Sequence, residues 1–173
     1  MFAISSTEKP DIPKLVDLKQ RLANVGVAYS LNPWITVGHS DRGRDDRQVL
    51  SGFQPLVGHD GVECKSCACP LNAAWRENTE KVWTLYSETQ PKVLWIEDDI
   101  RTFNHDPVRY SCFCPIHLKM FSERVGEQVS REMLADAIFK VGEPHAWRAE
   151  YMDMQAEVMI DTAAFLSRVV HAA

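Results

Sequence analysis

Five cysteines and one nearby histidine are the side chains of this sequence with the most definite chemistry. They fall in two short segments, Cys64-Lys-Ser-Cys67-Ala-Cys69 and Cys112-Phe-Cys114-Pro-Ile-His117. Thiolate and imidazole groups are the ligands of tetrahedral zinc, often two from each of two segments. The second segment would supply its two thiols and its imidazole where a loop enters a helix, and one thiol of the first would complete the set. The alternative is a group of reduced thiols buried as small hydrophobic side chains.

The first segment also contains the Cys-x2-Cys spacing of redox-active thiol pairs. Such a pair normally opens a helix that follows a strand. Cys64 and Cys67 instead lie in a long predicted loop, residues 35–70, so metal binding is the favoured interpretation of the cysteines. Disulfides are not expected, because the number of cysteines is odd and the chain is expected in the reducing cytoplasm.

A run of acidic residues after a short apolar segment is the second candidate site. The sequence Val93-Leu-Trp-Ile is followed directly by Glu97, Asp98 and Asp99. Ligands of parallel sheets bind beyond the carboxyl ends of the strands, and neighbouring carboxylates raise the pKa of at least one of them. Such a carboxyl group can act as a general acid near neutral pH. The alternative is that the three carboxylates cap a helix or lie in solvent.

Polar residues near this run suit hydrogen bonding to a polyhydroxylated ligand. Arg101, Asn104 and His105 follow the acids closely in the sequence. His39 comes just after the first predicted strand, so we also consider it a pocket residue.

Periodicity and end signals predict five helices and the strands between them. The helices cover residues 11–24, 72–88, 115–124 and 130–140, with a long last helix from about residue 143. Strands are predicted over residues 27–33 and 92–97, with a short one near residues 54–57. Asn72 is a suitable N-cap for the second helix, and Pro91 ends it. Because helix-to-strand steps occur twice, the pattern indicates an α/β fold with parallel strands.

Composition limits the partners of the chain. The 173 residues carry a formal net charge of −5, and no basic stripe of the kind that nucleic acids require is present. No apolar stretch approaches the roughly 20 residues that span a bilayer, and the first residues lack the pattern of a secretory signal. We therefore expect a cytoplasmic protein that binds neither nucleic acid nor membrane.

The stretch from Cys69 to Arg124 resembles the middle of the barrel in glycoside hydrolase family 42 and related glycosyl hydrolases. The residues that carry the resemblance are Cys69-Pro-Leu-Asn, Trp95-Ile-Glu-Asp-Asp, Cys112-Phe-Cys-Pro-Ile-His and Phe121. Upstream, Tyr29-Ser-Leu-Asn32-Pro-Trp and His39 resemble an earlier barrel strand and its ligand-facing loop.

The resemblance implies a partial (β/α)8 TIM barrel in a single domain, residues 1–173, that acts on O-glycosidic bonds. The implied catalytic acids are Asp98, Asp99 and Glu97, although the family has an Asn-Glu pair at this strand end. The implied substrate-binding residues are Arg101, Asn104, His105, His39 and Asn32. The implied ligands of a structural zinc ion are Cys69, Cys112, Cys114 and His117, the last standing where the family has a fourth cysteine. A whole barrel takes roughly 250 residues, so this chain would be a fragment without the nucleophile.

Two other interpretations remain open from the sequence. One is a non-catalytic, zinc-stabilised module that binds a carbohydrate or a protein. The other is a metal-dependent hydrolase with an open metal held by residues drawn from Glu97, Asp98, Asp99, His39 and His105. The expected partners are a carbohydrate substrate and either a second copy of the chain or the rest of the barrel.

Overall fold

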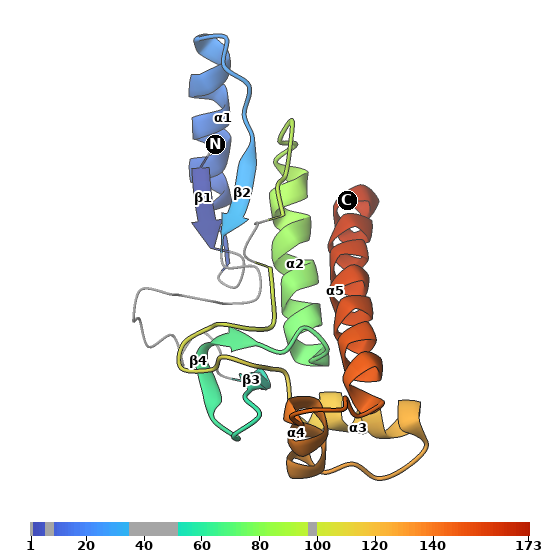
Figure 1. Cartoon of the computed structure of the whole chain (residues 1–173). Helices are drawn as coiled ribbons and strands as arrows, with labels where there is room; N and C mark the ends of the chain where they lie inside the picture. The colour runs from blue at the N-terminus through green and yellow to red at the C-terminus, as the bar shows by residue number, and fades with distance from the viewer. Residues whose placement is uncertain (1, 6–8, 35–51, 97–99) are drawn as a thin grey trace.

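The computed structural model describes residues 2–5, 9–34, 52–96 and 100–173 of the chain (Figure 1). Its helices are α1 (Ile12–Asn24), α2 (Ala73–Glu88), α3 (Pro115–Val125), α4 (Arg131–Phe139) and α5 (Trp147–Ala172). Its strands are β1 (Phe2–Ser5), β2 (Leu31–Trp34), β3 (Pro55–Val57) and β4 (Glu63–Ala68). None of the described helices combines the length and the apolarity that crossing a membrane requires.

The helices begin and end where the sequence predicts, within a few residues. The side chain of Asn72 accepts a hydrogen bond from the backbone N–H of Trp75 and so caps α2. Asp11 caps α1 in the same way. Gly126 ends α3 with a φ of 78°, a left-handed conformation that costs glycine little. Local capping chemistry therefore determines these boundaries.

The predicted partial (β/α)8 barrel is wrong. The described strands form two separate two-stranded sheets, in which β1 pairs with β2 in parallel and β3 pairs with β4 antiparallel. The apolar segment predicted as a strand over residues 92–97 makes one isolated bridge, between Leu94 and Leu31. A barrel requires each β/α unit to add a strand beside the previous one. Here the chain folds into a hairpin before α2, and α3, α4 and α5 follow one another with no strand over residues 115–173.

Helices α2 and α5 lie side by side and pack against each other (Figure 1). Trp83 of α2 packs with Leu166 and Val169 of α5 in one buried cluster. The ring of Phe165 lies 5.2 Å from the Arg76 guanidinium carbon, and that guanidinium also pairs with Asp161. The two helices thus form a rigid support for the segments that precede and follow α2.

A second buried cluster joins α3, α4 and the start of α5. Phe121 and Leu134 pack there with Phe113, Tyr151 and Met154. Phe113 lies in the segment that leads into α3, and its ring centroid is 5.2 Å from that of Tyr151. This packing holds the cysteine-containing segment against α5.

Candidate metal centre

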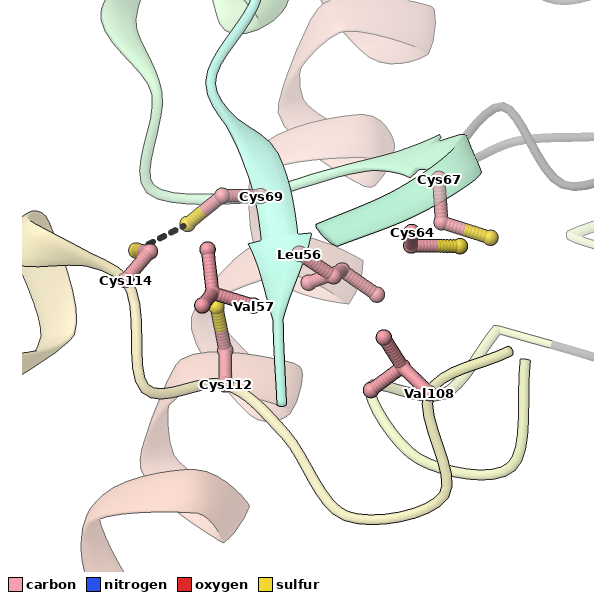
Figure 2. Packing of buried hydrophobic residues seen from close by; sticks show 8 residues of the cluster. All are labelled: Leu56, Val57, Cys64, Cys67, Cys69, Val108, Cys112 and Cys114. Carbon is pink, nitrogen blue, oxygen red and sulfur yellow. Dashed lines mark hydrogen bonds between the residues drawn. The ribbon is translucent and has the colours of Figure 1, made fainter. Parts of the chain in front are cut away.

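The four residues predicted to bind a metal lie together in the structure. Cys69 follows β4, Cys112 lies in the loop before α3, and Cys114 and His117 lie in the first turn of α3. All four are fully buried. Their potential ligand atoms all lie within 4.8 Å of one another, so the group could hold a metal ion. Figure 2 shows the thiols of Cys69, Cys112 and Cys114 converging from the hairpin and from the loop before α3.

The distances between the ligand atoms match the edges of a coordination tetrahedron. The sulfur atoms of Cys69 and Cys114 are 3.7 Å apart, and each lies 3.4 Å from Nδ1 of His117. Zinc bonds of about 2.3 Å to sulfur and about 2.05 Å to nitrogen, at tetrahedral angles, give separations of about 3.8 and 3.6 Å. Three of the separations therefore already suit a bound zinc ion, and the sulfur of Cys112 lies within 4.8 Å of the other ligand atoms.

The start of α3 explains how two ligands from one short segment converge. Cys114 occupies the N-cap position in an extended conformation, and Pro115 begins the helix. His117 is therefore at the third helical position, and N-cap and third-position side chains lie on the same side of a first turn. The positive end of the helix dipole also favours a thiolate at Cys114.

The thiols of the group do not ionise equally. Hydrogen bonding with Cys112 and then with Cys69 holds the pKa of Cys114 well below its usual range. Burial raises the pKa of Cys112 well above its usual range. The group on its own therefore favours a single thiolate stabilised by neighbouring thiols. A divalent cation would allow all three thiols to ionise, because it offsets the repulsion between thiolates.

A hydrogen-bonded connection runs from the metal ligands through α5 to the segment after the acidic run. The Tyr151 hydroxyl donates to the carbonyl of Cys112 over 3.4 Å. One turn further along α5, Gln155 accepts a hydrogen bond of 3.1 Å from the hydroxyl of Thr102. Since Thr102 and Gln155 are both buried, this contact fixes the position of the segment that carries Arg101.

The predicted substrate-binding residues are only partly brought together. Arg101 and Asn104 line a surface pocket of about 310 Å³, together with Asp106, Val108 and Arg109. His105 is buried beneath this segment, and its Nε2 lies 3.0 Å from the carbonyl oxygen of Arg101. The ring thus supports the segment and does not line the pocket.

Other predicted site residues lie elsewhere. Asn32 is half-buried in β2, and its Oδ1 has no hydrogen-bond partner in the described part of the chain. The predicted catalytic residues Glu97, Asp98 and Asp99, and the predicted ligand-binding His39, lie outside the described residues.

The sequence did not predict two groups of residues: the other polar residues of the pocket, and the α5 residues that hydrogen-bond near the metal ligands. Asp106 and Arg109 lie in an irregular loop with no motif that could have drawn attention to them. Tyr151 and Gln155 are four residues apart on α5 and are both buried. The link between them and Cys112 depends on tertiary packing.

Comparison with protein-family models, with curated proteins and with solved structures found no match for this chain. The resemblance to glycoside hydrolase family 42 therefore stays a prediction. What the structure shows directly is a buried group of three cysteines and one histidine that could hold a metal ion. Functional inference has to start from that geometry.

Proposed function

We propose that this chain is a zinc-stabilised carbohydrate-binding module. The observation that carries the proposal is the close spacing of the ligand atoms of Cys69, Cys114 and His117, at 3.4 to 3.7 Å from one another, with Cys112 beside them. Four protein ligands leave no coordination position for water or substrate, so the ion would be structural. It would hold the end of the β3–β4 hairpin against the start of α3.

The kind of ligand favours zinc over other common ions. Calcium and magnesium prefer oxygen ligands, and no carboxylate belongs to the group. Three thiolates with one imidazole in a closed tetrahedral site are an ordinary zinc set. The substitution of histidine for a fourth cysteine, which the resemblance implies, keeps the site competent for that ion.

The pocket beside Arg101 and Asn104 is the proposed carbohydrate site. Its guanidinium, amide and carboxylate groups can donate to and accept from sugar hydroxyls. Two aromatic residues adjacent in sequence to the pocket residues, Phe103 and Tyr110, are 57% and 55% exposed. Exposed aromatic rings beside polar groups suit the apolar face and hydroxylated rim of a sugar ring.

Glycoside hydrolase activity is a separate proposal, which rests on the resemblance alone. The carboxylates that would perform it, Asp98, Asp99 and Glu97, are not among the described residues. The open-metal hydrolase likewise relies on these carboxylates and on His39, while His105 is buried with its ring bonded to a backbone carbonyl. The binding module is the interpretation that the described residues support best.

Two measurements test the proposal. Elemental analysis of the purified chain should find about one zinc ion per chain, and a folded chain free of metal would contradict the zinc site. Binding to a panel of immobilised oligosaccharides should weaken at least tenfold in Arg109→Ala. The matched control is Arg21→Ala, which removes an exposed arginine on α1. Unchanged binding in Arg109→Ala would contradict the pocket, and release of reducing ends from the same panel would favour the glycoside hydrolase.

A further inference from the structure

Cys64 and Cys67 form a second thiol pair that takes no part in the metal group. Both lie on β4, where residues three apart in a regular strand would point to opposite faces. The pairing of β3 with β4 is irregular, and the two thiols hydrogen-bond to each other. The hydroxyl oxygen of Ser66 lies 3.8 Å from each sulfur. Figure 2 shows their sulfurs pointing away from Cys69 and Cys114.

Cys64 is the less deeply buried thiol of this pair. It is 3% exposed, whereas the other four cysteines are at 0%. Its sulfur lies 3.8 Å from the carbonyl oxygen of Asp106, a residue that lines the 310 Å³ surface pocket. The hydrogen bond from Cys67, opposed by burial, lowers the pKa of Cys64 to about 6. The lowered pKa makes the Cys64 thiol easier to ionise, and the thiolate is the reactive form of the side chain.

We propose that Cys64 and Cys67 are an oxidisable dithiol, which a peroxide converts into a disulfide while the group of Cys69, Cys112, Cys114 and His117 stays intact. The Cys64 thiolate attacks one oxygen of hydrogen peroxide. The O–O bond breaks, which gives a sulfenic acid at Cys64 and, after protonation, one water. The sulfur of Cys67 then attacks the sulfur of Cys64, the S–O bond breaks, and a second water leaves. In sum, two thiols lose two electrons and two protons, and the peroxide is reduced to two waters.

The metal group differs from this pair in its chemistry more than in its burial, because Cys67 is as deeply buried as the three thiols of the metal group. Thiols bound to a metal ion would also lack the free thiolate that attacks a peroxide. The metal group and the pair of Cys64 and Cys67 therefore have separate roles. The metal group holds an ion, and the pair responds to oxidants.

Peptide mapping tests the pairing directly, because Lys65 lies between the two cysteines. The zinc-supplemented full chain is treated with hydrogen peroxide, its remaining thiols are blocked with N-ethylmaleimide in denaturant, and it is digested with trypsin without reductant. Cleavage after Lys65 places Cys64 in residues 48–65 and Cys67 in residues 66–76. A disulfide joins these two peptides, and fragmentation should locate the maleimide on Cys69.

The expected result is a linked peptide pair that increases with peroxide, with the zinc content of the chain unchanged. In Cys67→Ser the link should disappear, and dimedone should instead trap a sulfenic acid at Cys64. Absence of the link in the treated wild type, a link from Cys64 to Cys69, or loss of zinc in step with oxidation would overturn the proposal. The pairing is identified from peptides, so a different metal in the site would not affect this result.

Discussion

The sulfur atoms of Cys69 and Cys114 lie 3.7 Å apart although 45 residues separate them in the chain. The intervening residues include the whole of α2. A metal ion bound at this point would close a long loop and reduce the conformational freedom of the unfolded chain. It would also join the hairpin to α3, in addition to the backbone hydrogen bond of 2.8 Å from Phe113 to Val57.

Replacing Cys114 with serine should remove both the metal and a large part of the stability. Binding of structural zinc supplies roughly 10–16 kcal/mol of apparent free energy in small zinc domains, so the loss should amount to several kcal/mol. Urea unfolding and elemental analysis of Cys114→Ser check this expectation. Cys67→Ser is the matched control, since that residue is equally buried on the same hairpin and should keep its zinc. Equal unfolding midpoints for the two variants would contradict a structural metal at Cys114.

His117 should tolerate exchange for cysteine but not for alanine. Its Nδ1, the ring nitrogen nearer to the backbone, faces the sulfurs of Cys69 and Cys114. A cysteine sulfur at this position reaches to a similar distance from the backbone, and four-cysteine zinc sites are common. Cobalt substitution should show a tetrahedral absorption spectrum in His117→Cys with stronger thiolate bands than in wild type. His117→Ala should bind cobalt at least tenfold more weakly, and wild-type affinity in that variant would remove His117 from the ligand set.

The helices and most of the metal group could be predicted because their signals are local. Asn72 caps α2, and the spacing of Cys112, Cys114 and His117 around Pro115 describes a helix start with three ligands. The first segment is a different case. Spacing alone could not choose among Cys64, Cys67 and Cys69, and only the fold shows that Cys69 faces the other ligands.

The prediction of a barrel was wrong because the alternation of helices and apolar segments does not determine which strands pair. The segment around Leu94 looks like a buried strand, yet it makes a single bridge with Leu31. Strand β4 lies in a stretch that was predicted as loop, because its residues, Glu63–Ala68, do not alternate between apolar and charged side chains. Periodicity cannot detect a strand that lacks this alternation.

Tyr29 should make the stability of the fold fall above pH 10. Burial raises the pKa of Tyr29 above its usual value of 10.0. The Thr89 hydroxyl donates to the carbonyl of Tyr86, so the phenol must donate to Thr89, which an ionised phenol cannot do. A raised pKa in the folded state means that the contribution is complete below pH 10 and is lost as the pH rises. Urea midpoints of wild type and Tyr29→Phe should therefore keep a constant difference below pH 10 and converge as the pH rises above it, and a difference that stays constant above pH 10 would contradict the assignment.

Two buried threonines should respond differently to the loss of a hydroxyl. In Thr102→Val, the side-chain oxygen of Gln155 loses a buried partner, and this should cost about 1–3 kcal/mol. In Thr162→Val, the hydroxyl no longer donates to the carbonyl of Val158. That carbonyl still accepts the backbone N–H four residues further along α5. That variant should change stability by less than about 0.5 kcal/mol, because no polar group is left unsatisfied. The two substitutions change size and burial in the same way. Urea unfolding of both variants therefore distinguishes the loss of the hydrogen bond between α5 and the pocket segment from a general effect of valine at a buried position. Equal losses in the two would show that Thr102 does not hold the pocket segment through Gln155.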